Sequence, residues 1–130
     1  MLVSITGLQA QKTFQDYKNE YPDFNEVVIL DYQGYDISIE NKKLKIIQNT
    51  SFESMILSEN GIHNNEETFT YSELVKLLEY DAFSVINNNG KEKKIKVTQT
   101  NEKNSSSSSV FFDDIKERQL IFPHLEKGAK

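Results

Sequence analysis

The chain has 130 residues and a formal net charge of −5, and it contains neither cysteine nor tryptophan. This length suffices for one domain with its own core, and the lack of cysteine excludes disulfides, thiolate metal sites and cysteine nucleophiles. Neither a run of about 18 apolar residues nor a basic region followed by an apolar stretch occurs. We therefore expect no membrane span and no signal peptide, and a location in the bacterial cytoplasm, or in the host cytoplasm for a phage protein.

The charge is unevenly distributed along the chain. Residues 1–90 carry 6 Lys/Arg against 14 Asp/Glu, a net of −8, whereas residues 91–130 carry 9 against 6, a net of +3. An acidic surface repels phosphate backbones and attracts basic surfaces. The body of the protein is therefore expected to favour a basic partner over nucleic acid.

Two helices are expected. Residues 6–21 place apolar side chains near one helical face, and Pro22 should end this helix, because a residue before proline is disfavoured in the α region. Residues 69–78 combine a capping box, formed by Thr70 and Glu73, with a hydrophobic staple from Phe69. These devices predict a second helix at residues 69–78.

The strands are expected to be short and antiparallel. Residues 27–48 predict a meander of three strands, with turns at residues 33–34 and 41–43, because apolar and polar residues alternate between them. Residues 52–57 predict a fourth strand, followed by a two-residue turn at residues 60–61. Residues 83–97 predict a hairpin that turns at Asn89 and Gly90, a pair that tolerates positive φ.

The C-terminal part changes character twice. Residues 98–109 end in five serines and indicate a flexible linker. Residues 110–125 are rich in apolar side chains, and part of this segment, before Pro123, is compatible with a helix. Two alternatives remain open for it: it folds back onto its own domain, or it docks on another protein.

These elements predict an α+β fold, with an antiparallel sheet of about five to six short strands, two helices on one face and a tethered C-terminal apolar segment. The domain organisation expected is a single α+β domain over residues 1–99, a Ser-rich linker over 100–109 and an apolar tail over 110–130.

Markers of catalysis are missing from the sequence. His63 and His124 have no neighbours at metal-ligand or triad spacing, and the phosphate-loop, zinc-protease and elbow-serine motifs do not occur. Adjacent carboxylates such as Glu66 and Glu67 lack the alternating spacing of a calcium loop. We therefore expect a non-enzymatic protein without metal or cofactor, with an enzyme that uses an unfamiliar carboxylate site as a remote alternative.

The leading hypothesis is a small acidic protein-binding module, an inhibitor, immunity or anti-defence factor of a bacterial phage or mobile element. Its partner would be another protein, with a basic one favoured, and its oligomeric state is left open. The residues expected to bind the partner come from the second predicted strand and the tail: Asp31, Tyr32, Tyr35, Asp36, Glu40, Phe111, Phe112, Leu120 and Phe122.

The alternative is a nucleic-acid-associated accessory protein that uses the basic arm of the predicted hairpin. That arm carries Lys91, Lys93, Lys94 and Lys96. Clustered lysines attract phosphates, but lysines on an edge strand also prevent edge-to-edge pairing, and no aromatic side chains are interleaved for base stacking.

Overall fold

The computed structural model describes residues 11–105 and 114–130 of the chain. In these residues it contains one α-helix, one short 3-10 helix and seven strands. Their bounds are α1 Phe14–Glu20, β1 Glu26–Glu40, β2 Lys43–Ile56, η1 Glu59–His63, β3 Glu66–Tyr71, β4 Phe83–Asn88, β5 Lys91–Lys96, β6 Gln99–Asn104 and β7 Lys116–Ile121. The fold is therefore mainly β, and the predicted α+β fold with two helices on one sheet is wrong.

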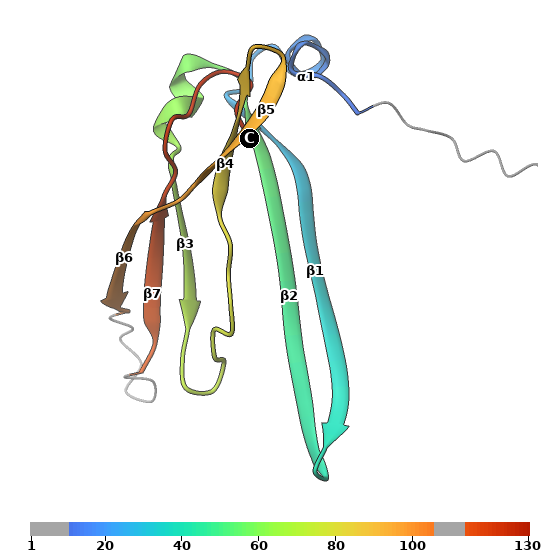
Figure 1. The fold of residues 1–130 in the computed structure, drawn as a ribbon, viewed down its shortest axis with the longest axis vertical. Coiled ribbons are helices and arrows are strands. Elements are labelled where there is room, and N and C mark those ends of the chain that lie inside the picture. The colour runs from blue at the N-terminus through green and yellow to red at the C-terminus, as the bar shows by residue number, and fades with distance from the viewer. Residues whose placement is uncertain (1–10, 106–113) are drawn as a thin grey trace, which may run out of the picture.

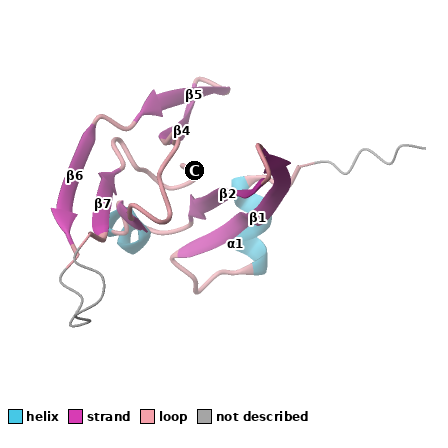
Figure 2. Cartoon of the chain, turned by 90° about the horizontal axis from the view of Figure 1, so that it is seen from below, coloured by secondary structure: helices cyan, strands magenta, loops and turns pink. Residues whose placement is uncertain are grey.

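The molecule has two limbs that are joined at one end (Figure 1). One limb is the long antiparallel hairpin of β1 and β2, and the other is a three-stranded sheet in the order β3-β7-β6. Strands β4 and β5 form a third, two-stranded sheet near the joined end. The view from below also shows the hairpin and the three-stranded sheet on separate sides (Figure 2).

The hairpin exists because a two-residue turn reverses the chain at Asn41 and Lys42. Their φ angles of 51° and 63° are those of a type I′ turn, whose twist matches that of the flanking strands. Pairing runs from Glu40 opposite Lys43 to Glu26 opposite Ile56, with one irregularity in β1 between residues 28 and 30. The predicted three-stranded meander is wrong, because one long strand occupies most of residues 27–40.

Gly34, which was expected in a turn, lies in the middle of β1 opposite Asn49. The hydroxyl of Tyr32 occupies the place that a Cβ at position 34 would take. The glycine therefore makes room for the neighbouring tyrosine ring and does not reverse the chain.

The last residues of the given sequence join the β1–β2 hairpin to the β4–β5 sheet. The N–H of Gly128 donates to the carbonyl of Ile56 at 2.8 Å, and the N–H of Ile56 donates to the carbonyl of Ala129 at 2.9 Å. On the other side, Lys130 and Val85 exchange two backbone hydrogen bonds of 2.6 and 2.9 Å. With Gly128 at φ 87°, this pattern is a glycine bulge that runs antiparallel to β2. Residues 128–130 thus form a short bridging strand between β2 and β4.

The core surrounds this junction. The buried hydrophobic residues are Met55, Ile56, Leu57, Val85, Val97, Leu120 and Ala129. Phe14, the first residue of α1, packs against the same place, since a Cβ on Gly128 would lie 3.4 Å from its ring. The end of β2, β4, β7 and the C-terminal residues therefore share one small core.

The first predicted helix is present in shorter form. Thr13 caps α1, and its side chain and that of Asp16 complete a capping box. The helix ends before Pro22, as expected, and residues 6–10 of the predicted segment lie outside the described residues.

The second predicted helix is wrong. Residues 69–71 belong to β3, where Phe69 lies opposite Arg118 of β7, and residues 72–82 contain no helix. Ser72 accepts a hydrogen bond from the N–H of Val75 at 3.1 Å, and Asp114 accepts one from the N–H of Glu73 at 2.8 Å. Strand pairing and these local bonds satisfy the backbone groups that the capping box was expected to satisfy, so tertiary contacts override the local signal.

Of three further local predictions, two are confirmed and one is wrong. The strand predicted at residues 52–57 is confirmed as the end of β2, and the hairpin at Asn89 and Gly90 is confirmed, with φ angles of 54° and 81°. The turn predicted at residues 60–61 is wrong, because these residues belong to η1.

Strands also occupy the C-terminal region. β6 begins at Gln99, and β7, which was considered for a helix, is the central strand between β3 and β6. Residues 114–130 are therefore folded against the rest of the protein, and the helical interpretation of this part is wrong.

Lys42 is the strained position of the hairpin turn, because a residue with a Cβ is disfavoured at positive φ. We expect Lys42→Gly to raise the free energy of unfolding by about 1 kcal/mol. The matched control is Lys43→Gly in β2, which should lower it by roughly 0.5–1 kcal/mol, since glycine weakens a strand. Urea denaturation measures both, and an equal effect of the two changes would contradict the turn assignment.

The bridging strand can be tested by removing residues 128–130. Hydrogen exchange of the Ile56 and Val85 amides should accelerate strongly, because both donate to this segment. The Val97 amide, which donates to the carbonyl of Ala82 at 2.9 Å, is the internal control and should keep its protection. Unchanged protection of Ile56 and Val85 would contradict the junction.

Candidate functional site: the apolar face of the β1–β2 hairpin

The hairpin carries apolar side chains on one of its two faces. Because side chains alternate along a strand and partners share a face, the odd residues of β1 after the irregularity and the even residues of β2 lie together. Seven large apolar side chains on this face, the apolar face, are between 50% and 76% exposed. They are Val28, Tyr35, Ile37, Ile39, Leu44, Ile46 and Phe52.

Five of these side chains, at the end of the hairpin nearer the turn, are neighbours on this face, whereas Gln33 and Thr50 separate them from Phe52 and Val28. Ile39 lies opposite Leu44, and Ile37 lies opposite Ile46. A two-residue turn makes its closing pair a hydrogen-bonded one, so both of these pairs are of the non-hydrogen-bonded kind, in which the side chains lie closer together. The lower half of the face is consequently a ladder of touching aliphatic groups.

The apolar face is directed to the side of the hairpin on which η1 lies. Ile56 continues the even positions of β2, and its Cγ2 atom would lie 3.1 Å from a Cβ on Gly61 of η1. At this end the face is buried, with Ile56 only 3% exposed. Farther along the hairpin the two limbs separate and the face is exposed (Figure 1).

A second group of exposed apolar side chains lies on the segment of residues 72–82. Leu74, Val75 and Leu78 are 80%, 64% and 71% exposed. In the view of Figure 1 this segment lies between β3 and β2. Exposed apolar groups thus come from both limbs.

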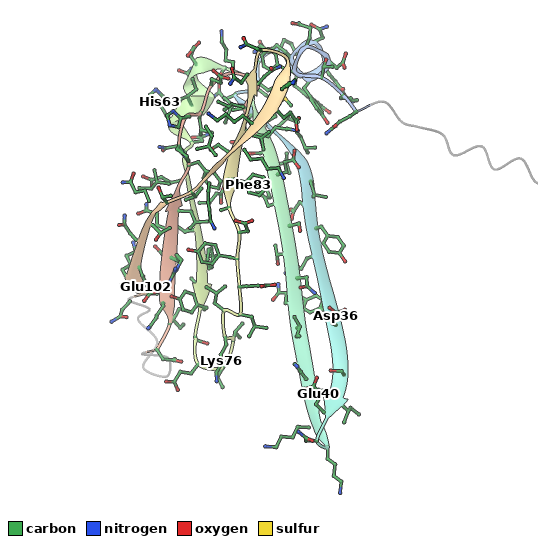
Figure 3. All side chains as sticks on the ribbon, viewed as in Figure 1. Asp36, Glu40, His63, Lys76, Phe83 and Glu102 are labelled. Atoms are coloured by element: carbon green, nitrogen blue, oxygen red, sulfur yellow. The ribbon has the colours of Figure 1, made fainter. Side chains whose placement is uncertain are left out.

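The opposite face of the hairpin is more polar, although it also carries Leu30, Tyr32 and the half-buried Ile47. Lys45 forms an ion pair with Glu40 at 3.0 Å, and the amide of Asn49 donates to Asp36 at 2.9 Å. Figure 3 shows Asp36 and Glu40 on the lower part of the hairpin, with Glu102 and Lys76 on the other limb. The hairpin is therefore amphipathic although both of its faces are exposed.

The residues predicted to bind a partner are distributed over several places. Asp31 and Tyr35 lie on the apolar face, whereas Tyr32, Asp36 and Glu40 lie on the polar face. Leu120 is buried and Phe122 is half-buried, while Phe111 and Phe112 lie outside the described residues. The structure therefore does not gather these residues on one surface.

Four residues that the sequence-based interpretation left out dominate the apolar face: Ile37, Ile39, Leu44 and Ile46. Their alternation with polar residues is the signal in the sequence, and it predicts strands with one apolar face. This alternation shows that the face is apolar, but it does not show whether another part of the protein covers it.

The lysines of the predicted nucleic-acid surface are also divided. Lys91 and Lys93 lie on one face of β5, and Lys94 and Lys96 lie on the other, as alternation requires. The ammonium group of Lys94 lies 4.4 Å from the centre of the Phe83 ring. The arm therefore does not present four lysines to one phosphate backbone.

The other limb contains a polar cluster around Arg118 of β7. Arg118 donates to the hydroxyls of Tyr71 and Tyr80, both at 3.1 Å, and to the carboxylate of Glu102 at 2.6 Å. The Tyr71 hydroxyl also donates to Glu102. Hydrogen bonds from Tyr71 and Arg118 lower the pKa of Glu102, and those to Tyr71, Tyr80 and Glu102 raise the pKa of Arg118. The cluster ties β3, β6 and β7 together.

A shallow pocket of about 410 Å³ adjoins this cluster. Its charged groups balance in sign, with Glu73 and Asp114 against Lys76 and Lys116. Within residues 11–105 and 114–130, no group of three or more His, Cys, Asp or Glu side chains gathers as a metal site would require. The apolar face is thus the most distinctive exposed feature of the described residues.

Among the described residues, none of the helices has the length and apolar composition needed to cross a membrane.

Residues 45–130 match the family described as Domain of Unknown Function with solved-structure structure (DUF3857). The chain belongs to this family. The match includes most of β2 and all later elements, whereas α1 and β1 precede it. Neither a curated protein nor a solved structure matches the chain. The function of the DUF3857 chain must therefore be argued from its own surfaces.

The Arg118 cluster predicts a specific acid sensitivity. The ordinary pKa of a glutamate is 4.5, and that of Glu102 is lowered in the folded protein. The ionised carboxylate of Glu102 therefore stabilises the fold fully above the ordinary pKa of 4.5. This contribution is lost as the pH decreases from there through the lower pKa of the folded protein. We expect Glu102→Gln to be less stable than wild type at pH 7, with a difference that shrinks below pH 4.5.

Urea denaturation at several pH values measures this difference. Glu79→Gln, which removes an exposed carboxylate outside the cluster, is the matched control and should show a much smaller effect at pH 7. A Glu102→Gln difference that stays constant down to pH 3 would contradict the assignment.

Proposed function

We propose that this DUF3857 chain is a protein-binding module whose binding surface is the apolar face of the β1–β2 hairpin. The observation that carries the proposal is the exposure of seven large apolar side chains on one face of a single hairpin. Large contiguous apolar patches on soluble proteins commonly mark interaction sites.

The size of the surface supports this proposal. Side chains of this kind expose roughly 150–200 Å² each when free, so exposed fractions of 56–76% give about 500–650 Å² for the contiguous group of Tyr35, Ile37, Ile39, Leu44 and Ile46. This is at the upper end of the largest patch on a typical monomer, about 300–600 Å², a size that is often functional.

The instability of an isolated hairpin gives a second reason. A two-stranded hairpin is marginally stable in water unless another layer covers its apolar face or another strand extends it. A partner that covers this face would therefore both bind the module and stabilise the hairpin.

The acidic charge of residues 1–90 supports a basic partner, because opposite charges accelerate association. The narrower role of an inhibitor, immunity or anti-defence factor stays a prediction from sequence. The divided lysines of β5 give no support to the nucleic-acid alternative, and we do not propose it.

Two neighbouring residues of β2 provide a matched test. Ile46 lies on the apolar face and Ile47 on the opposite one, and threonine at either position keeps the branched Cβ that suits a strand. We expect Ile46→Thr to weaken capture of a partner from host lysate by about tenfold, the cost of losing one buried aliphatic group. Ile47→Thr should capture the partner as wild type does.

Affinity capture with quantitative mass spectrometry measures the three chains side by side, and sedimentation equilibrium shows whether the partner is a second copy. Equal capture of the same proteins by both variants would contradict binding through the apolar face.

A further inference from the structure

We propose that the outer edge of β2 binds an extended segment of a partner protein as an added antiparallel strand. This inference rests on the proposed function, and it specifies how the partner binds. It follows from three observations: the direction of the backbone groups of β2, the direction of the bridging strand, and the width of the space between β2 and β4 at the end where the bridging strand lies.

The backbone groups of alternate residues in β2 are directed away from β1. The two-residue turn makes Glu40 and Lys43 a hydrogen-bonded pair, and such pairs then alternate along the hairpin. Odd-numbered residues of β2 therefore bond to β1, and even-numbered residues direct their N–H and C=O groups outward. Ile56 agrees with this rule, since both its backbone groups bond to the bridging strand.

Six outward-directed residues precede Ile56 along β2. Among the described strands, β1 alone pairs with β2. The free edge is about 40 Å long, because a strand rises about 3.3 Å per residue. The residues with outward-directed backbone groups are Leu44, Ile46, Gln48, Thr50, Phe52 and Ser54.

The bridging strand sets the direction of the added strand. Residues 128–130 run antiparallel to β2 and pair at the upper end of this same edge. A segment placed below them would continue their line along β2. Exposed edges of this length normally pair with another strand, are covered or carry protective charges. Lys45 is the only charged residue between positions 44 and 52, so charge protects this edge little.

The space beside the bridging strand favours a single extended segment over a second copy. Residues 128–130 bond to Ile56 on one side and to Val85 on the other, so at this end of β2 one strand fits between β2 and β4. Each described strand is already paired with a neighbour, so a strand from a second copy would bring that neighbour with it. An unpaired segment of a partner is the occupant that can continue the line of the bridging strand without a further strand beside it.

The neighbouring side chains determine the pattern of the segment. A residue that pairs with an even position of β2 has its side chain on the apolar face, next to groups such as Ile46 and Phe52. The residues before and after it in the partner segment direct their side chains to the opposite face, next to Lys45, Asn49 and Ser51 of β2. The partner segment should alternate apolar and polar residues, as β-augmentation ligands do.

The probe is a fluorescent peptide of alternating valine and threonine, about ten residues long to match the edge, with lysine at each end for solubility. When the valines lie on the apolar face, their N–H groups point to β2 and those of the threonines point away. N-methylation of three valines should weaken binding by about a hundredfold, since each lost hydrogen bond costs roughly fivefold. N-methylation of three threonines should weaken it by less than about threefold.

A protein variant tests the same bonds from the other side. Thr50→Pro removes an outward N–H at a position where an edge strand tolerates proline, and should weaken peptide binding by about fivefold or more. Thr50→Val keeps the N–H and should bind as wild type. Fluorescence anisotropy measures affinity, and circular dichroism establishes that the variants are folded.

Binding that depends on the valine amides and on the Thr50 N–H supports strand addition. A different result would overturn strand addition but leave the proposed function intact. In that result, Ile46→Thr abolishes peptide binding, and the two N-methylation patterns weaken it equally. Self-association of the protein that excludes the peptide overturns the inference in favour of a second copy. If the folded monomer does not bind the peptide, strand addition is also overturned. The capture experiment tests the proposed function separately.

Discussion

The hydrogen bonds of the last three residues are the constraint on which the described fold depends. Residues 128–130 bond to Ile56 of β2 and to Val85 of β4, and these contacts join segments that the chain order separates widely. Ala129 is fully buried between them, and the Lys130 side chain forms ion pairs with Glu53 and Glu92. Without this bridge, the long hairpin would be attached mainly by its connections to α1 and η1.

The position of the bridge also explains why so much of the hairpin is exposed. The bridge contacts β2 only at its end, and the buried core lies around this contact. Beyond it, the ladder of Ile37, Ile39, Leu44 and Ile46 has the composition of a core but the exposure of a surface. The hydrophobic effect disfavours such a surface in water, so a covering layer would gain free energy in proportion to the area removed from water. This gain in free energy on covering the apolar face is the physical reason for proposing that the face binds a partner.

The other limb reaches its stability differently. β7 pairs on both edges, with β3 and with β6, and Arg118 ties both neighbours to it through Tyr71 and Glu102. The hydrogen bonds of this cluster hold the three strands together, although the buried Nε of Arg118 has no partner among the described residues. This limb is thus held together by pairing on both edges of β7 and by the contacts of Arg118.

The sequence by itself determined the local features whose causes are local. The Asn89-Gly90 turn, the end of the first helix before Pro22 and the alternation on both sides of Asn41 follow from backbone sterics and side-chain periodicity. Tertiary structure decided the features in which distant groups compete for the same backbone. The Thr70 capping box gave way to pairing between β3 and β7, in which a strand distant in sequence supplies the hydrogen-bond partners for the backbone of residues 66–71. Exposure of the apolar face was likewise decided only in three dimensions, since alternation shows that a face is apolar but not whether another layer covers it.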